Sequence, residues 1–219
     1  MDKEKLNSRC RVYTFHDIPE CLTHVFLING KRHVFVIDTY CGPDCMVPIL
    51  NDIATMAQGK EIVVINTHYH WDHVWGNCAF RDAEIIAHSL CKTKMEQEWE
   101  RMMTSQQQFI RGKVEPKFPT ITFNERLVFE EEGITLEHTP GHTSDSITVY
   151  SSGDRIVFVG DNLERPKIYL EEQNVDTYVQ TISRYRELEN QRIMAGHSLD
   201  LSCTDIQANL ESLLELKGK

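Results

Sequence analysis

Long apolar runs and an excess of basic residues are both missing from this sequence. No apolar stretch approaches the roughly 20 residues that cross a bilayer as a helix. Lys and Arg together number 23 against 33 Asp and Glu, which gives a formal net charge of −10. A general nucleic-acid binder needs a basic surface for phosphates, so this charge balance predicts no nucleic-acid partner. The lack of apolar runs likewise predicts no membrane partner.

A signal peptide and a regular cysteine framework are also missing. The first residues, Met1-Asp2-Lys3-Glu4-Lys5, are charged, and no apolar segment follows them as it would in a secretory signal. The cysteines number seven, and an odd count is typical of free thiols in a reducing compartment. Cys41 and Cys45 flank an ordinary loop sequence, and no second cysteine pair follows them. We therefore expect a cytoplasmic protein with free thiols.

The sequence does contain enough apolar material for one large core. Its 219 residues are 41% hydrophobic and 26% charged, which is an ordinary composition for a soluble globular protein. A chain of this length suits one domain, so we expect a single domain over residues 1–219.

One short motif is so unusual that the interpretation of the remaining sequence starts from it. Residues 68–73 read His-Tyr-His-Trp-Asp-His, directly after the β-branched run 61–65, which is typical of a buried strand. Three imidazoles and a carboxylate in six residues are poorly suited to a core, but imidazole and carboxylate are good ligands for zinc and iron. The motif therefore predicts a metal site.

The spacing within the motif indicates how its side chains point. Alternate residues of an extended segment face the same way, so His68, His70 and Asp72 can share one pocket. His73 follows where the chain turns and can approach from another side. One loop could thus supply two adjacent metal ions.

Periodicity and turn signals predict alternating strands and helices in the first part of the chain and a strand-rich second part. The expected strands are residues 11–15, 21–29, 32–37, 61–65, 84–87, 120–123, 126–129, 134–138, 146–150, 155–159 and 192–195. The expected helices are residues 48–57, 89–109, 175–185 and 204–216. Residues 120–138 resemble a three-stranded meander, and Thr204 with Gln207 fits a capping box.

Three roles stay open on the sequence alone. Asp38, at a strand end, is either a turn former or a support for a metal ligand. The segment 89–119, rich in Met and aromatic residues, fits a helix packed on the sheet, with a lid or a homodimer face as the alternative. Tyr69 and Trp71 alternate away from the ligands and either pack inside or line the pocket.

Three more ligand-type residues share one local context. His142, Asp161 and His197 each follow a predicted strand and a glycine. Glycine lets the backbone turn sharply at a strand end, and strand ends at one sheet edge commonly carry active sites.

These separated motifs, in this order, resemble those of metallo-β-lactamase-fold hydrolases, in the branch typified by glyoxalase II and related dinuclear hydrolases. The matching positions run from the strand end at Asp38 to His197, nearly the whole fold. The resemblance implies an α/β (α+β) fold: a four-layer αβ/βα sandwich of two mixed β-sheets, with helices outside and metals at one sheet edge.

The resemblance also implies a dinuclear centre in which two sets of three ligands are joined by one shared carboxylate. The first set is His68, His70 and His142, the second is Asp72, His73 and His197, and the shared carboxylate is Asp161. Two divalent ions are expected, zinc before iron, manganese or nickel. Asp72 has a second, catalytic role, because it can orient the attacking hydroxide.

Such a site implies a hydrolase that uses a bridging hydroxide to cleave a small-molecule thioester, ester or lactone. Two departures bear on the substrate. The chain ends soon after His197, without the helical region that supplies basic residues for glutathione in glyoxalase II, which puts glutathione thioesters in doubt. Glu164 stands three residues past Asp161, where lactonases of the superfamily have Tyr.

Three other functions are compatible with parts of this pattern. A phosphodiesterase of the same fold is opposed by the acidic charge balance. An oxidoreductase resembling the mononuclear-iron persulfide dioxygenases keeps the motif and would bind one iron. A non-catalytic binding module is opposed by the complete ligand set. The substrate-binding residues are not identified by any motif.

Overall fold

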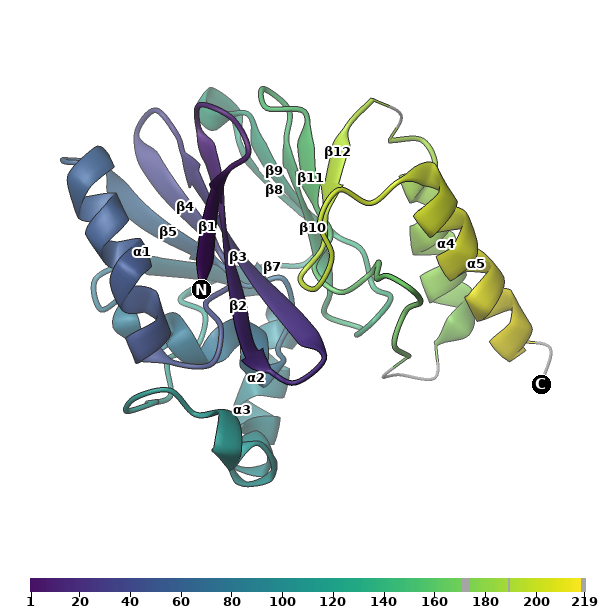
Figure 1. The fold of residues 1–219 in the computed structure, drawn as a ribbon, viewed down its shortest axis with the longest axis horizontal. Coiled ribbons are helices and arrows are strands. Elements are labelled where there is room, and N and C mark those ends of the chain that lie inside the picture. Colours follow the sequence, from purple (N-terminus) through teal and green to yellow (C-terminus); the bar gives the residue numbers. More distant parts are fainter. Residues whose placement is uncertain (171–173, 189, 218–219) are drawn as a thin grey trace. The chain divides into compact units, whose positions relative to one another are not determined.

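The protein is described here by a computed structural model, which covers residues 1–170, 174–188 and 190–217 (Figure 1). The chain forms two compact units, Met1–Asn124 and Glu125–Lys219. Each unit is built on one β-sheet that mixes parallel and antiparallel pairs and carries its own helices. The predicted α/β class with two mixed sheets is therefore confirmed.

The first unit contains a seven-stranded sheet whose spatial order equals the sequence order, β1 to β7. Strands β1 to β4 pair antiparallel, and strands β4 to β7 pair parallel. Its elements are β1 Asp2–Lys5, β2 Cys10–Ile18, β3 Cys21–Asn29, β4 His33–Ile37, α1 Pro43–Met56, β5 Glu61–Ile65, α2 Trp71–Val74, η1 Trp75–Ala79, β6 Glu84–His88, α3 Ser89–Ser105, η2 Gln107–Phe109 and β7 Ile121–Phe123. Short turns join the antiparallel strands, whereas longer connections, each containing one or two helices, join the parallel ones, as their geometry requires.

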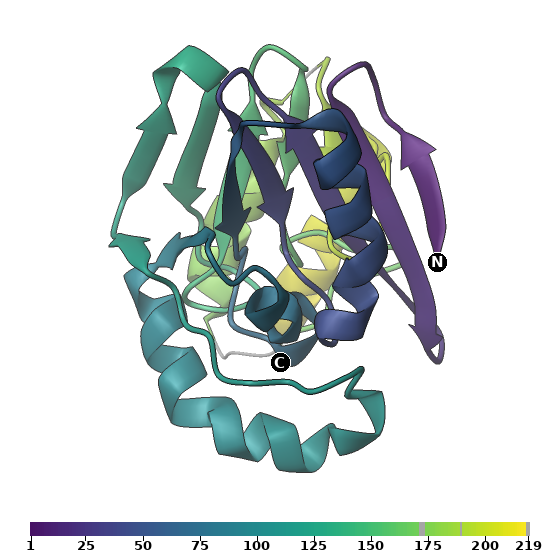
Figure 2. The same ribbon diagram turned by 90° about the vertical axis from the view of Figure 1, so that its left-hand side faces the viewer.

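Helices α1 and α3 belong to the first unit (Figure 2), and each of them packs on it through an apolar stripe. Met46, Ile49 and Ile53 of α1 are buried in a cluster with the alternating side chains of β4. The stripe of α3 consists of Cys91, Met95, Trp99 and Met102, which pack in a second cluster with the motif residue Tyr69. The helix 89–105 therefore packs on its own unit, in agreement with the first of the two roles considered for this segment.

The second unit contains a five-stranded sheet in the order β12-β11-β10-β9-β8. Its elements are β8 Arg126–Phe129, η3 Glu130–Glu132, β9 Ile134–His138, β10 Ile147–Ser151, β11 Ile156–Phe158, α4 Val175–Tyr185, β12 Arg192–Met194 and α5 Cys203–Lys217. Strand β12 pairs parallel with β11, and the other pairs are antiparallel. Helices α4 and α5 lie side by side and share one apolar cluster with this sheet (Figure 1).

Several predicted element bounds were wrong. Helix α1 begins at Pro43 instead of residue 48, because proline is well suited to the first helical turn and Pro48 is accommodated inside. The long helix ends at Ser105, and η2 follows as a separate 3₁₀ turn. Strand β1 was missed because all four of its residues are charged and exposed.

The predicted meander 120–138 was also wrong in its first strand. Strand β7 pairs parallel with β6 in the first sheet, and the antiparallel run of the second sheet begins at β8 and continues through β9, β10 and β11. A strand of three residues shows too little periodicity to reveal its partner.

The capping pair of α5 differs from the predicted pair of Thr204 and Gln207. The backbone N–H of Ser202 donates to Asp205 Oδ2 (2.8 Å), and the backbone N–H of Asp205 donates to Ser202 Oγ (3.3 Å). This is the reciprocal arrangement of a capping box. Periodicity places the helix correctly, but it does not distinguish between two polar pairs that are two residues apart.

The pH dependence of stability follows from this cap. Hydrogen bonds from the Arg165 guanidinium hold the pKa of the Asp205 carboxyl below the ordinary value of 3.8. A depressed pKa stabilises the fold above the unfolded-state pKa, and the contribution is lost as the pH falls below it. We expect Asp205→Asn to lower the free energy of unfolding by about 1 kcal/mol at pH 7 and by progressively less below pH 4. Urea unfolding at several pH values tests this, with the exposed Glu215→Gln as control; a difference independent of pH would contradict it.

Candidate metal centre

The motif residues lie in the first unit, directly after β5. His68 and His70 are on the extended segment, and Asp72 and His73 are on the single-turn helix α2. His68 Nε2 lies 3.0 Å from His70 Nδ1, and Asp72 Oδ2 lies 3.5 Å from His73 Nε2. All but His70, which is half-buried, are buried. One loop thus gathers four ligand-type side chains.

Asp38 lies behind this loop, at the end of the neighbouring parallel strand β4. Its carboxylate accepts hydrogen bonds from Thr67 N and Thr67 Oγ1, both at 2.8 Å, and lies 2.9 Å from His73 Nδ1. Because a carboxylate only accepts, Nδ1 of His73 carries the proton and leaves Nε2 available as a ligand. Both roles open for Asp38 find an observation: its carboxylate supports His73, a predicted ligand, and its left-handed φ of 62° is typical of a turn.

A buried pair of asparagines, which the sequence did not indicate, also holds the loop. Asn66 Nδ2 donates to Asn77 Oδ1 (3.0 Å), and Asn77 Nδ2 donates to Asn66 Oδ1 (2.8 Å). Thr39 Oγ1 donates to Asn77 Oδ1 (2.9 Å), and the backbone N–H of Thr39 donates to His73 O (2.8 Å). The chain passes through Gly76, where a Cβ would lie 1.9 Å from Thr39 O, so only glycine fits there.

The other three predicted ligands lie in the second unit and surround one carboxylate. His197 Nε2 lies 3.0 Å from Asp161 Oδ2, and His142 Nε2 lies 3.7 Å from the same oxygen. His142 follows β9, Asp161 follows β11 and His197 follows β12, as the sequence predicted. This unit therefore gathers two imidazoles around one buried aspartate.

Hydrogen bonds orient these side chains as well. Nδ1 of His142 donates to Tyr169 O (3.0 Å), which leaves its Nε2 free of a proton in the neutral ring. The backbone N–H of His142 donates to Asn162 Oδ1 (2.9 Å), and Asn162 Nδ2 donates to Thr139 O (2.8 Å). Tyr178 Oη donates to the backbone oxygen of Asp161 (3.2 Å).

The glycines before these ligands serve different purposes. Gly160 has a left-handed φ of 54°, which agrees with the sharp turn expected at a strand end. Gly141 is instead required by close packing, because a Cβ there would lie 2.5 Å from Asn162 Oδ1 and 2.6 Å from the Tyr178 ring. At Gly141 the reason for glycine is therefore close packing, whereas a sharp turn was expected.

The remaining histidines have contacts in other parts of each unit. Their neighbours are Asp2 for His16, Thr14 for His24, Glu61 for His33, Asn124 O for His88 and Ser144 O for His138. His88 also caps α3, because its Nδ1 accepts from Leu90 N (3.2 Å).

The cysteines are all free thiols in the described residues, where all seven lie. Burial raises the pKa of the Cys45 thiol to about 11, and it raises that of Cys41 further. Both thiols therefore stay protonated at neutral pH, which disfavours a redox role for this pair. The predicted loop between them is wrong, because Pro43, Asp44 and Cys45 form the first turn of α1.

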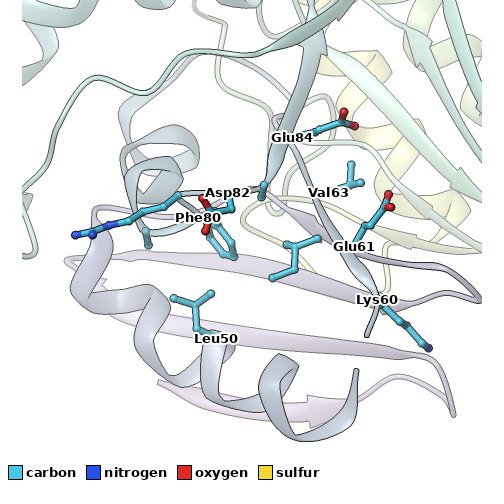
Figure 3. Close-up of a pocket in the computed structure, with 11 residues that line it drawn as sticks. Leu50, Lys60, Glu61, Val63, Phe80, Asp82 and Glu84 are labelled. Carbon is cyan, nitrogen blue, oxygen red and sulfur yellow. The ribbon is translucent and has the colours of Figure 1, made fainter. Parts of the chain in front are cut away.

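A separate hollow of about 730 Å³ opens elsewhere in the first unit (Figure 3). Leu50 of α1 and Phe80 face it, and Glu61 and Glu84 mark the beginnings of β5 and β6 on its rim. The metal-binding motif follows the opposite end of β5. Among the described residues that line the hollow, none is a predicted metal ligand.

Comparison with known proteins identifies the family. The family model of the metallo-β-lactamase superfamily matches residues 18–197, so the chain belongs to that superfamily. Two solved metallo-β-lactamases share its fold. The enzyme from Pontibacter korlensis has a TM-score of 0.78 at 19% identity over 97% of this chain and 98% of its own. DIM-1, determined after exposure to ceftazidime, has a TM-score of 0.77 at 17% identity over 99% and 97%.

Relatives with assigned activities are hydrolases. The cytoplasmic hydroxyacylglutathione hydrolase of Saccharomyces cerevisiae is 33% identical over 65% of this chain and 48% of its own length. The bovine acyl-coenzyme A thioesterase MBLAC2 is 24% identical over 80% and 72%, respectively. A Drosophila melanogaster β-lactamase-like protein 2 homolog is 23% identical over 80% of this chain, and the match covers 58% of the length of that protein. The chain thus belongs to the metallo-β-lactamase superfamily and carries candidate metal-binding His and Asp residues, and relatives that it resembles are hydrolases, although it spans only about half the length of several of them.

Among the residues described, none forms a helix both long and apolar enough to cross a bilayer.

Proposed function

We propose that the chain is a dinuclear, zinc-dependent hydrolase of small-molecule thioesters. In this proposal the two units act as one domain, and their seven ligand-type residues form one centre. The donor chemistry supports it, because five imidazoles and two aspartates are the ligands that zinc prefers. The family match supports it too, since it extends from residue 18 to residue 197 and so includes residues of both units.

The observation that favours thioesters is the set of relatives. An acyl-coenzyme A thioesterase, acyl-carrier-protein thioesterases of fungi and hydroxyacylglutathione hydrolases all match this chain. The names of these relatives refer to a thioester or a glutathione derivative, whereas the solved β-lactamases are similar in fold only. Esters and lactones are the second choice, because the same site chemistry cleaves them.

Each ligand residue has an assigned place in the proposal. His68, His70 and His142 hold one ion, Asp72, His73 and His197 hold the other, and Asp161 is shared. When bound, two such ions supply a nucleophile at neutral pH and a Lewis acid for the substrate carbonyl. Asp72, buried beside His73, orients the attacking water through its carboxylate. Asp38 keeps Nε2 of His73 deprotonated, and Tyr169 O does the same for His142.

Metal analysis combined with thioester hydrolysis tests this function. We expect about two zinc ions per chain, thiol release from S-acetyl and S-octanoyl N-acetylcysteamine, loss of activity with a chelator and recovery with zinc. His138→Ala, outside the proposed centre, is expected to keep both metals and activity. One iron per chain, with oxygen consumption on persulfide, would contradict the proposal and favour the oxygenase. Hydrolysis of phosphodiesters alone would favour the phosphodiesterase.

We also propose a cytoplasmic location and a small-molecule partner. The cytoplasmic yeast relative and the free thiols support the location, and the net charge of −10 argues against nucleic acid as substrate.

A further inference from the structure

One aromatic residue of the motif pairs with an aromatic side chain outside it, and the pair has no part in the function proposed above. Trp71 stands between His70 and Asp72 in the sequence, and its ring stacks on that of Phe109, with centroids 5.0 Å apart and planes 15° apart. Both side chains are half-buried, whereas the neighbouring Tyr69 is buried against α3. Because Trp71 is flanked in the sequence by two ligand-type residues, this partly exposed pair offers an apolar surface close to them.

Phe109 belongs to a segment that is firmly held. Residues 107–119, called the strap here, lead from η2 back to β7 alongside α3 (Figure 2). Near its start, the backbone N–H of Arg111 donates to Cys41 O (3.1 Å). Near its end, Asn77 Nδ2 donates to Lys117 O (3.1 Å). The strap is thus anchored at both ends and is not a loose loop.

The second anchor connects the strap to the ligands. Asn77 also bonds Asn66 and Thr39, and Thr39 bonds the backbone of His73. The same polar cluster therefore positions a predicted metal ligand and the strap that carries Phe109. A surface held at a constant distance from the ligands is preorganised for substrate, which lowers the entropy cost of binding.

We propose that Trp71 and Phe109 form the wall that binds the acyl chain, and that the substrates are thioesters of apolar acyl groups of about six carbons or more. This inference rests on the proposed function. Each methylene buried against such a wall raises affinity about fourfold. A charged acyl group would lose its hydration there without a partner, so the wall selects against it.

A purely structural role for the pair makes a different prediction. Trp71 packs against two apolar clusters of the first unit, and it could serve only to join them. In that case a change at Phe109 would lower stability and would affect short and long substrates equally. The test therefore compares two chain lengths in the same metal-loaded protein.

We expect the wild type to favour S-octanoyl over S-acetyl N-acetylcysteamine in kcat/KM. Phe109→Ala should lower this ratio about tenfold, mainly through KM for the octanoyl substrate, with metal content unchanged. Phe109→Leu, which keeps an apolar side chain, should lie between the two. The matched control is Phe118→Ala on the same strap, because Phe118 packs edge-on against Trp99 (5.6 Å, 88°) and not against Trp71; its ratio should equal that of the wild type.

A binding measurement separates the wall from the catalysis. N-acetyl-S-octylcysteamine lacks the carbonyl and cannot be hydrolysed, so calorimetry reports binding alone. We expect it to bind at least tenfold tighter than the S-ethyl analogue, and to lose that advantage in Phe109→Ala. Preferential octyl binding without hydrolysis of either thioester would overturn the proposed function but would support the apolar wall of Trp71 and Phe109. Equal hydrolysis of both thioesters, with an unchanged ratio in Phe109→Ala, would overturn the proposal that these two residues bind the acyl chain. It would still support the proposed thioesterase function.

Discussion

Replacing Asp161 with Ala is expected to reduce thioester hydrolysis by at least about a thousandfold and to lower the metal content below two ions per chain. In the proposed centre this carboxylate is shared by both ions, so its loss removes a ligand from each. Within the second unit its Oδ2 is the atom that both His142 and His197 approach. The measurement is zinc per chain together with kcat on the metal-loaded variant.

A second substitution at the same position separates charge from shape. Asp161→Asn keeps the volume and one carbonyl oxygen but removes the negative charge, so we expect nearly the same loss of metal with less change in stability. Asp176→Ala, an exposed position on α4, is the matched control and should keep both ions. If Asp161→Ala retained two ions and full turnover, the assignment of this residue as the shared ligand would be wrong.

Replacing Asp38 with Asn is expected to weaken zinc binding by about 10- to 100-fold, although this residue is no ligand in the proposed centre. The wild-type carboxylate lies within hydrogen-bonding distance of three donors, two on Thr67 and one on His73. An amide offers one oxygen and a competing N–H₂ group, so His73 would lose the partner that fixes its tautomer. We also expect the free energy of unfolding to fall by about 2 kcal/mol in the metal-free protein, because buried donors lose their acceptor.

Competition with a chelator measures the zinc affinity, and urea unfolding of the metal-free protein measures the stability. The exposed Asp17→Asn, in the same unit, serves as the control and should change neither quantity. A variant that is destabilised but binds zinc as tightly as the wild type would show that Asp38 supports the fold and not the ligand.

The sequence was most informative where one residue type carries a specific chemistry. The six-residue motif and the three separate ligand-type residues were recognisable because imidazole and carboxylate are rare in such patterns unless they bind metal. The residues that hold them were not recognisable. Asn66, Asn77 and Asn162 have ordinary side-chain amides, and only the fold shows which partners they meet.

Element bounds were least predictable where local signals compete. Pro48 suggested a helix start, but Pro43 occupies the first turn and the apolar stripe of α1 decides the rest. Strand β7 looked like part of a meander because its true partner is β6, and the paired residues Ile86 and Ile121 are 35 positions apart. No local pattern spans such a distance.

The strand order of the first sheet has a consequence for how the protein is made. Each strand from β2 to β7 hydrogen-bonds to the strand that precedes it in the sequence, so every new strand finds its template already synthesised. Chains are folded from the N-terminus as they leave the ribosome, and sequential pairing keeps unpaired edges short-lived. The first unit, with its four ligand-type side chains and their supporting aspartate, can therefore assemble during translation before residue 125 has emerged.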